Sequence, residues 1–298
     1  MKRALAVAFT LALALAAAAH AESLRGMWTA STWSVKDIER IQVNMTREHS
    51  NWGQDFKLAA FEGLSRAQIT SASDVPVKFA LRRDAGTISF DGSFRDGEGA
   101  GHFTFTPNDS YLGTLRSMNV KLDDERDHDR TEGEELFRLA MFDVSLDFIR
   151  QMRNLGYDVG VRDLVRFRIH GVNPEMVGEL HTLGLDHVPA EDLVRMRIHG
   201  ATPEFIRAMA DSGYRNMTVE SLVRFRIHGV TPEFVHEIAS LGYRDVPSEE
   251  LVRMRIHGVT PEFIRDVETA GYKNVPVEKL IQMRIRGIDG AYLKAMSK

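Results

Sequence analysis

The C-terminal half of the chain repeats itself every 29 residues, and this period constrains the fold more than any other feature of the sequence. An eight-residue box, Leu-Val-Arg-Phe/Met-Arg-Ile-His-Gly, occurs at 164–171, 193–200, 222–229 and 251–258, and a divergent fifth copy occurs at 280–287. A second box, Asn/Thr-Pro-Glu-Met/Phe, follows each of the first four copies. Self-similarity at a fixed period of this length is typical of arrays in which each unit packs on its neighbours.

One repeat unit predicts two short helices joined by tight turns. The threonine that opens the second box is a preferred N-cap residue, and the proline after it fits the first helical position, where no N–H is needed. A Gly-Tyr or Gly-Leu pair closes each unit, and glycine supplies the left-handed residue that ends a helix. We expect the leucine, valine and isoleucine of the first box to point mostly inward. Because one hairpin cannot bury its apolar face alone, we predict a solenoid of about twelve short helices over residues 135–298, with degenerate end copies as caps.

Residues 22–118 show a different periodicity. Apolar and polar residues alternate along four runs, at 40–46, 75–82, 87–94 and 102–106. Strict alternation predicts strands with one buried and one solvated face, and Asp96-Gly97 is a strong hairpin signal. We predict about six strands in an antiparallel meander, closed as a small barrel or curled over a helix, with a helical turn at 65–69 and a closing helix at 109–118. The fold class is therefore α+β in two parts: a small antiparallel β-rich domain, then an α-helical hairpin repeat solenoid.

Residues 1–21 predict a signal peptide. Lys2 and Arg3 precede a run of small and apolar residues, and Ala-His-Ala at 19–21 fits the small-x-small cleavage rule. An uncleaved N-terminal anchor is the alternative. No later stretch approaches the roughly 20 apolar residues of a spanning helix. The chain has no cysteine for disulfides, thiol chemistry or lipid attachment. We therefore expect a periplasmic or secreted protein without a membrane span after signal cleavage.

The run from 121 to 135 is almost wholly charged or polar, and we expect none of its residues to be buried. It predicts an exposed linker over residues 119–134. The acidic side chains at 123–129 could instead hold a hard cation, although their spacing is not that of a calcium-binding loop. Without Lys2 and Arg3 the chain has 36 basic and 42 acidic residues. This balance favours solubility and gives no support to binding of nucleic acids or anionic membranes.

All three tryptophans, Trp28, Trp33 and Trp52, lie in the predicted β-domain. They could line a pocket for an apolar or sugar ligand, or they could be ordinary core and rim residues. The Gly-x-Gly-x-Gly run at 97–101 also has two interpretations. A phosphate-binding loop would open a helix, whereas this run enters a predicted strand, where alternate glycines let a bulky neighbour cover the backbone. We therefore favour a structural role for these glycines.

Each first box carries two arginines two positions apart, which cannot share a helix face. They are Arg166 and Arg168, Arg195 and Arg197, Arg224 and Arg226, and Arg253 and Arg255. One of each pair is expected to bridge to Glu204, Glu233 or Glu262 of a neighbouring repeat. The other could face a groove and bind an acidic peptide or polyanion as a partner-binding residue. Residues 143–298 hold 21 basic and 22 acidic side chains, a balance that favours bridging.

A histidine column, His170, His199, His228 and His257, is the most evident metal candidate. Equivalent residues of stacked helices lie about 10 Å apart. One zinc ion needs its nitrogens about 2 Å away. Arg286 also takes the histidine position in the fifth copy. We therefore predict a structural role for this column at the helix C-terminus, and we predict no metal and no cofactor.

The Arg-Ile-His-Gly-Val-Thr-Pro-Glu-Phe pattern resembles repeats of uncharacterised bacterial exported proteins and repeats appended to membrane metallopeptidases of the beta-lactam-sensor type. The resemblance covers roughly residues 135–298. It implies an accessory or sensory module rather than proteolysis, because the His-Glu-x-x-His zinc motif of those peptidases is absent: the nearest string, His236-Glu237, ends in Ser240. Ile-His-Gly-Val-Thr-Pro-Glu also looks like a helix–hairpin–helix nucleic-acid motif. That motif needs a second glycine, and a threonine or asparagine stands there instead.

No motif commits the chain to a reaction, since we find no Gly-x-Ser-x-Gly elbow, phosphate loop or paired-carboxylate signature. The leading hypothesis is a non-enzymatic exported cell-envelope interaction, scaffold or sensory accessory protein that binds a protein partner through its repeats. A rival hypothesis is a small-ligand-binding protein that uses an aromatic pocket in the β-domain. Two further hypotheses are an enzyme with an unrecognised site and nucleic-acid binding through the repeats, and the charge balance disfavours the second of these.

Overall fold

The computed structural model describes residues 21–32, 39–48, 50–122 and 130–296. The predicted signal peptide thus lies almost wholly outside the described residues. The chain divides into two compact units. The first comprises residues 1–82, 86–113 and 130–137, and the second comprises residues 83–85, 114–129 and 138–298. Among the described helices, none combines the length and the apolar character that crossing a bilayer requires.

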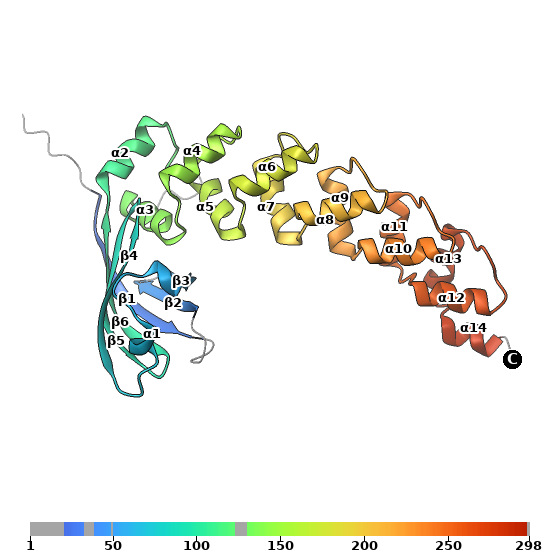
Figure 1. The fold of residues 1–298 in the computed structure, drawn as a ribbon, viewed down its shortest axis with the longest axis horizontal. Coiled ribbons are helices and arrows are strands. Elements are labelled where there is room, and N and C mark those ends of the chain that lie inside the picture. Colours follow the sequence, from blue (N-terminus) through green and yellow to red (C-terminus); the bar gives the residue numbers. More distant parts are fainter. Residues whose placement is uncertain (1–20, 33–38, 49, 123–129, 297–298) are drawn as a thin grey trace, which may run out of the picture. The chain divides into compact units, whose positions relative to one another are not determined.

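Six strands form one antiparallel sheet (Figure 1). They are β1 (Leu24–Ser31), β2 (Arg40–Arg47), β3 (Ser50–Lys57), β4 (Val75–Arg83), β5 (Gly86–Arg95) and β6 (Glu98–Pro107). The strand order is β3-β2-β1-β6-β5-β4, so two three-stranded meanders are joined by the pairing of β1 with β6. The four alternating runs of the sequence are β2, β4, β5 and β6, as predicted. The strands β3 and β4 stand at the two ends of this order, and Glu62, which follows β3, pairs with Ala80 of β4 through two backbone hydrogen bonds of 2.8 and 2.9 Å. The two ends of the sheet therefore approach each other, and full closure into a barrel stays a prediction.

The glycine-rich segment serves the packing of the sheet. Asp96 and Gly97 both have positive φ, 50° and 88°, and form the predicted hairpin turn between β5 and β6. A Cβ atom on Gly99 would lie 2.6 Å from the ring of Phe94, and one on Gly101 would overlap the backbone oxygen of Asp91 on the neighbouring strand. Both positions therefore exclude side chains so that a ring and a strand can approach, which matches the structural interpretation of this run.

Three short helical segments accompany the strands: η1 (Leu58–Ala60), α1 (Arg66–Ile69) and α2 (Asp109–Ser117). Helix α1 begins at a capping box, in which the Ser65 side chain and the Gln68 side chain each bond the other residue's backbone N–H. At α2 the Asn108 side chain accepts a hydrogen bond from the backbone N–H of Ser110 at 3.1 Å. Both helices lie where the sequence predicted them.

Helix α3 (Glu132–Met141) begins inside the segment that we predicted to be a linker. Thr131 and Glu134 form a reciprocal cap, with N–H···O distances of 3.3 and 3.0 Å. Glu135 is only 7% exposed and pairs with Arg130 at 3.3 Å. The expectation that nothing in the charged run is buried was therefore wrong at two positions: Gly133 is buried, and so is Glu135, whose charge an arginine neutralises. The acidic residues at 123–129 lie outside the described residues.

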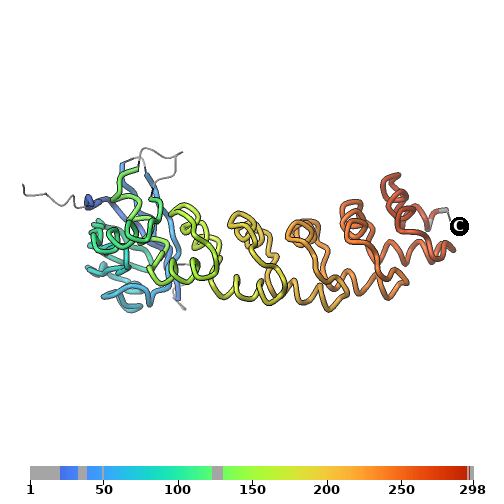
Figure 2. Tube along the Cα trace, turned by 90° about the horizontal axis from the view of Figure 1, so that it is seen from above, coloured from blue at the N-terminus to red at the C-terminus, as the bar shows by residue number. Residues whose placement is uncertain are grey.

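Twelve helices, α3 to α14, make up the repeats in the described part of the chain, which matches the predicted number. We call the helices of the first box the box-1 helices: α5 (Val161–His170), α7 (Ala190–His199), α9 (Val219–His228), α11 (Ser248–Ile256) and α13 (Val277–Ile285). The box-2 helices are α4 (Leu146–Asn154), α6 (Pro174–Thr182), α8 (Pro203–Asp211), α10 (Pro232–Ser240), α12 (Pro261–Thr269) and α14 (Gly290–Met296). Each box-1 helix contacts the next box-1 helix, and most box-2 helices likewise contact the next, so the array has two layers. Figure 2 shows the hairpins following one another at a regular interval.

The ends of the repeat helices follow the local signals of the sequence. Thr202, Thr231 and Thr260 accept hydrogen bonds from the backbone N–H three residues later at 3.4, 3.2 and 3.2 Å, and a proline occupies the first helical positions. The glycine before each tyrosine has positive φ, for example 97° at Gly213. Tyr214 then donates its backbone N–H to the carbonyl of Met209 at 2.9 Å, as in a helix C-cap of the Schellman type.

Candidate functional site

The isoleucine of every first box points outward, contrary to our expectation. Ile169, Ile198, Ile227, Ile256 and Ile285 have 50, 56, 50, 51 and 53% of their surface exposed. In α7, Leu193, Val194 and Met196 are buried and occupy the sides of the helix that face its neighbours. Ile198 follows Met196 by two positions, about 200° around the helix, and is therefore left on the solvent side. We call these five residues the isoleucine row.

The isoleucine row recurs on every box-1 helix. Its members occupy equivalent positions on box-1 helices that contact one another in succession, from α5 to α13. Packed helices lie about 8–10 Å apart, which sets the interval between neighbouring isoleucines. A single exposed isoleucine on a protein surface needs no explanation, whereas its recurrence at five equivalent positions makes this row a candidate interaction surface.

The first arginine of each box forms a ladder with the next repeat. Arg195, Arg224 and Arg253 bind glutamates 25 residues later, Glu220, Glu249 and Glu278, at N···O distances of 2.5, 2.6 and 2.7 Å. Arg166 lies 3.5 Å from Asp163 of its own helix. The predicted bridge between repeats is therefore present, but Glu204, Glu233 and Glu262 are not the glutamates that form this ladder. The ladder arginines precede the isoleucines by one helical turn, so a neutral, ion-paired strip flanks the isoleucine row.

The pKa shifts of the ladder glutamates and of the second-box glutamates have different causes. The hydrogen bond to Arg224 lowers the pKa of Glu249, and the same bond raises the pKa of the Arg224 guanidinium. The hydrogen bond from the N-cap threonine lowers the pKa of Glu204, and backbone hydrogen bonds lower the pKa of Glu233 and Glu262. The second-box glutamates thus stabilise the start of their own helices.

The second arginine of each box clamps the preceding repeat. The Nε–H groups of Arg197, Arg226 and Arg255 donate to the backbone carbonyl of the histidine 27 residues earlier, at 3.0, 3.4 and 3.4 Å. Arg168 makes the same contact to the carbonyl of Phe142 at 3.0 Å and pairs with Asp143 at 2.9 Å. A cation at the C-terminus of a helix is favourable because the free carbonyls there carry partial negative charge. We call these residues the clamp arginines, together with Arg284, which takes the equivalent position but donates to the carbonyl of Ile288 at 3.3 Å instead of to the preceding repeat.

Most clamp arginines also stack on an aromatic ring. Their guanidinium carbons lie 4.9 to 5.2 Å from the ring centroid of the last residue of a second box. The pairs are Arg168 with Phe148, Arg226 with Phe205, Arg255 with Phe234, and Arg284 with Phe263. Arg197 differs because Met176 takes the ring position. Both arginine columns are thus engaged within the array, and their binding of an acidic partner stays a prediction that this geometry does not favour.

The histidine column lies at the ends of the box-1 helices. The backbone carbonyls of His170, His199 and His228 accept hydrogen bonds from clamp arginines. The imidazoles of His228 and His257 contribute electrostatically to the lowered pKa of the Glu249 and Glu278 carboxyl groups. Among the residues that the structure describes, no group of three or more histidine, aspartate or glutamate side chains is arranged to hold a metal ion. The column therefore belongs to the contacts between repeats.

The tryptophans were the other predicted site. Trp28 is 1% exposed, with its ring centroid 5.4, 5.9 and 5.5 Å from those of Phe79, Phe90 and Phe94. Its indole N–H donates to the carbonyl of Asp91 at 3.3 Å. These contacts make Trp28 a core residue, so the structure offers no aromatic pocket at this position.

The remaining tryptophans divide between packing and the undescribed part of the chain. Trp52 is half-buried and lies edge-on to the ring of Phe137, with a centroid distance of 5.0 Å. Phe137 of α3 also contacts Phe103 and Phe105, so the sheet packs on the first part of this helix, as one of the two predicted arrangements required. Trp33 lies outside the described residues.

Comparisons with protein families, with curated proteins and with solved structures gave no match. Sequence reasoning missed the isoleucine row because it expected the leucine, valine and isoleucine of the first box to point mostly inward. The helical phase carried the missing signal, since four apolar residues spread over 200° of a helix cannot all face inward.

Proposed function

We propose that this chain is a non-enzymatic, exported cell-envelope protein whose repeats bind a protein partner along the isoleucine row. The observation that carries the proposal is the presence of a half-exposed isoleucine at the same position of all five box-1 helices. The neighbouring columns of the first box are engaged inside the array: the ladder and clamp arginines are bonded, and leucine and valine are buried. The isoleucine row is the apolar column whose contacts are left to another molecule.

The row also specifies the kind of surface that would fit it. Its partner would present apolar side chains in a line at intervals of about 10 Å, the spacing of packed helices. An α-helix with an apolar residue at every seventh position rises about 10.5 Å between them and meets this condition. Burying the exposed half of one isoleucine contributes about 1 kcal/mol to binding. Stable binding therefore requires a partner that buries several of the five isoleucines at once. The flanking ladder is ion-paired, and we therefore expect binding to depend little on salt concentration.

Position-specific cross-linking of the full-length protein tests this proposal. A photoreactive phenylalanine analogue at Ile227 should form an adduct with a distinct envelope protein, and Ile198→Ser together with Ile256→Ser should abolish that adduct. The matched control carries the same analogue at Glu237, an exposed residue of box-2 helix α10, and should form no specific adduct. Circular dichroism should show equal helix content in all variants.

Three results would contradict the proposal. Adducts from both positions would mean that the surface is generally adhesive. An adduct with a second copy of this chain would mean that the row mediates self-association and does not bind a distinct partner. Recovery of the protein in the cytoplasmic fraction of cells that express the full chain would refute the export that the sequence of residues 1–21 predicts.

A further inference from the structure

The histidine column interleaves with the isoleucine row. On each of the first four box-1 helices the histidine follows the isoleucine directly, so the two side chains lie about 100° apart around the helix. The ladder arginine, three residues before the isoleucine, lies about 60° around in the same sense, and Arg224 reaches Glu249 of the next box-1 helix. The imidazole of His228 therefore leans toward the same helix, between Ile227 and Ile256. A partner that covers consecutive isoleucines also covers the imidazoles between them.

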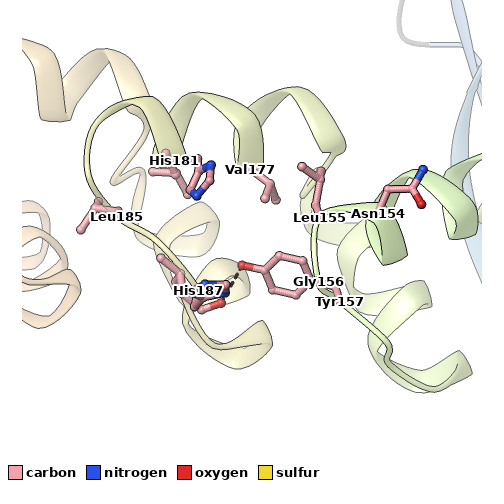
Figure 3. Close-up of a pocket in the computed structure, with 10 residues that line it drawn as sticks. Asn154, Leu155, Gly156, Tyr157, Val177, His181, Leu185 and His187 are labelled. Carbon is pink, nitrogen blue, oxygen red and sulfur yellow. Dashed lines mark hydrogen bonds between the residues drawn. The ribbon is translucent and has the colours of Figure 1, made fainter.

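The offset between consecutive repeats is held at both ends of the hairpins. At the end that carries the isoleucine row, clamp arginines bond the backbone carbonyls of the histidines. At the opposite end, the Tyr157 hydroxyl donates to the carbonyl of Val188 of the following repeat at 2.8 Å (Figure 3). Tyr214 and Tyr243 make the same bond at 2.6 and 2.7 Å. The imidazoles thus keep a regular place between the isoleucines.

The carboxylates near the imidazoles are already engaged. His228 interacts electrostatically with Glu249 of α11, and this carboxylate accepts two hydrogen bonds from Arg224, at 2.6 and 2.9 Å. Arg255 of α11 bonds the carbonyl of His228 and adds a second cation. Glu233, in the first turn of α10, is held by hydrogen bonds of its own helix start. A protonated imidazole at this position would therefore find no free carboxylate.

The neighbouring positions of the column have the same surroundings. His257 interacts with Glu278 of α13, which is bound by Arg253 at 2.7 Å. His199 lies one helical turn after Arg195, which binds Glu220 of α9 at 2.5 Å. The three histidines that precede a ladder pair are thus equivalent in their charged neighbours.

Of the groups at this surface, the imidazoles are the ones whose charge changes in mild acid. Imidazole is the side chain that ordinarily exchanges its proton between pH 5 and pH 8, whereas arginine stays protonated. Hydrogen bonds to Arg224 and Arg253 lower the pKa of Glu249 and Glu278, so these carboxylates keep their charge in that range. A fall in pH therefore adds positive charge beside the isoleucines and leaves the ladder neutral.

A partner that covers the isoleucine row with apolar side chains removes the imidazoles from water. Burial disfavours the charged form of a histidine, and a buried charge without a free partner is costly. Binding and protonation therefore compete. We propose that the histidine column makes binding along the isoleucine row sensitive to pH, so that the apolar partner is held at neutral pH and released in mild acid. The inference rests on the proposed function, because it concerns the same surface.

The test repeats the cross-linking from Ile227 of the full-length protein in one envelope extract at pH 7.5 and at pH 5.5, over a range of protein concentrations. The concentration that gives half of the maximal adduct should rise in mild acid, by about tenfold for each histidine that binding keeps neutral. Glutamine is neutral at both pH values. A column variant with three such replacements should therefore lose most of this rise: His199→Gln, His228→Gln and His257→Gln.

The matched control carries three glutamines at histidines outside the column, and it should keep the full rise. His181 and His187 lie at the closing turn of a hairpin, at the end away from the isoleucine row (Figure 3), and His236 is an exposed residue of α10. Circular dichroism at both pH values should show equal helix content in all variants. If the column variant loses helix content, His228→Gln alone is measured and should reduce the rise by about tenfold.

The outcomes separate this inference from the proposed function. An adduct that forms equally at both pH values would overturn the inference and leave the proposed function intact. A stronger adduct in mild acid would also overturn it, because the partner would then supply carboxylates to the imidazoles. A rise that persists unchanged in the column variant would place the pH-sensitive groups on the partner and refute the role of the histidines. No adduct at either pH would refute the proposed function, and the inference with it.

Discussion

The sheet of the first unit and the repeat array of the second bury apolar surface in different ways. In the sheet, Trp28, Phe79, Phe90 and Phe94 pack in one cluster. The contacts of each ring occur once and are not repeated elsewhere in the cluster. In the array, buried leucine and valine residues and a phenylalanine or methionine recur at equivalent positions, and an equivalent arginine clamps the junctions up to that of Arg255.

This difference determines how each region responds to change. A cluster of interlocking rings loses several contacts when one ring is removed, because the surrounding side chains collapse only partly into the space. Repeats contact only their neighbours, so their stability is close to a sum of repeat and junction contributions. The recurrence also makes deviations visible. An exposed column such as the isoleucine row is noticed only against the pattern of its sisters.

The largest effect is expected in the sheet. Trp28→Ala should reduce the free energy of unfolding by about 3–5 kcal/mol, the range for a buried tryptophan. The adjacent and 60% exposed Met27 is the control, and Met27→Ala should change stability by less than about 0.5 kcal/mol. Urea unfolding should be followed by tryptophan fluorescence, since all three tryptophans precede residue 53, and by far-ultraviolet circular dichroism, to which the repeat helices contribute most. An equal shift of both signals would show that sheet and array unfold as one unit.

A smaller effect is expected at the repeat junctions, where two clamps can be compared. Arg255→Met removes a hydrogen bond to a helix C-terminus and a ring contact, and should cost about 1.5 kcal/mol. Arg197→Met removes the hydrogen bond alone, because Met176 stands at the ring position, and should cost about 1 kcal/mol. The cost of Arg255→Met should fall to that of Arg197→Met when it is measured in a Phe234→Leu background, where the ring is absent. Equal losses for both single variants would show that the stacked ring contributes nothing.

The smallest effect is expected from the arginine–glutamate ladder, and it should depend on pH. The folded-state pKa values of Glu249 and Glu278 are lowered by hydrogen bonds to Arg224 and Arg253. A lowered folded-state pKa contributes stability above the unfolded value of about 4.5, and this stability is lost as the pH falls through the folded value. The urea midpoint of the array should therefore fall between pH 6 and pH 3. Glu249→Gln with Glu278→Gln should flatten this dependence. An unchanged slope would mean that the exposed ladder does not contribute to stability.

The elements with local causes could be predicted from the sequence. The threonine caps, the proline after each of them and the positive-φ glycines act within a few residues, so the repeat period specified the number and the ends of the helices. Alternation identified four strands because each strand has one buried face. The cap at Thr131 carried the same kind of signal, but the surrounding charges obscured it. The site was less accessible: the arginines were named, whereas the exposure of the isoleucine row was not predicted.

The sequence by itself thus determined that this chain is a β-rich part followed by an array of capped helical hairpins. The tertiary structure alone decided that β1 pairs with β6, that Arg224 pairs with Glu249 rather than with Glu233, and which side of each box-1 helix stays in solvent. The physical reason is the distance along the chain. Caps and turns are settled by neighbours in sequence, whereas contacts across 25 or more residues depend on how packed helices and strands are offset, which no local pattern encodes.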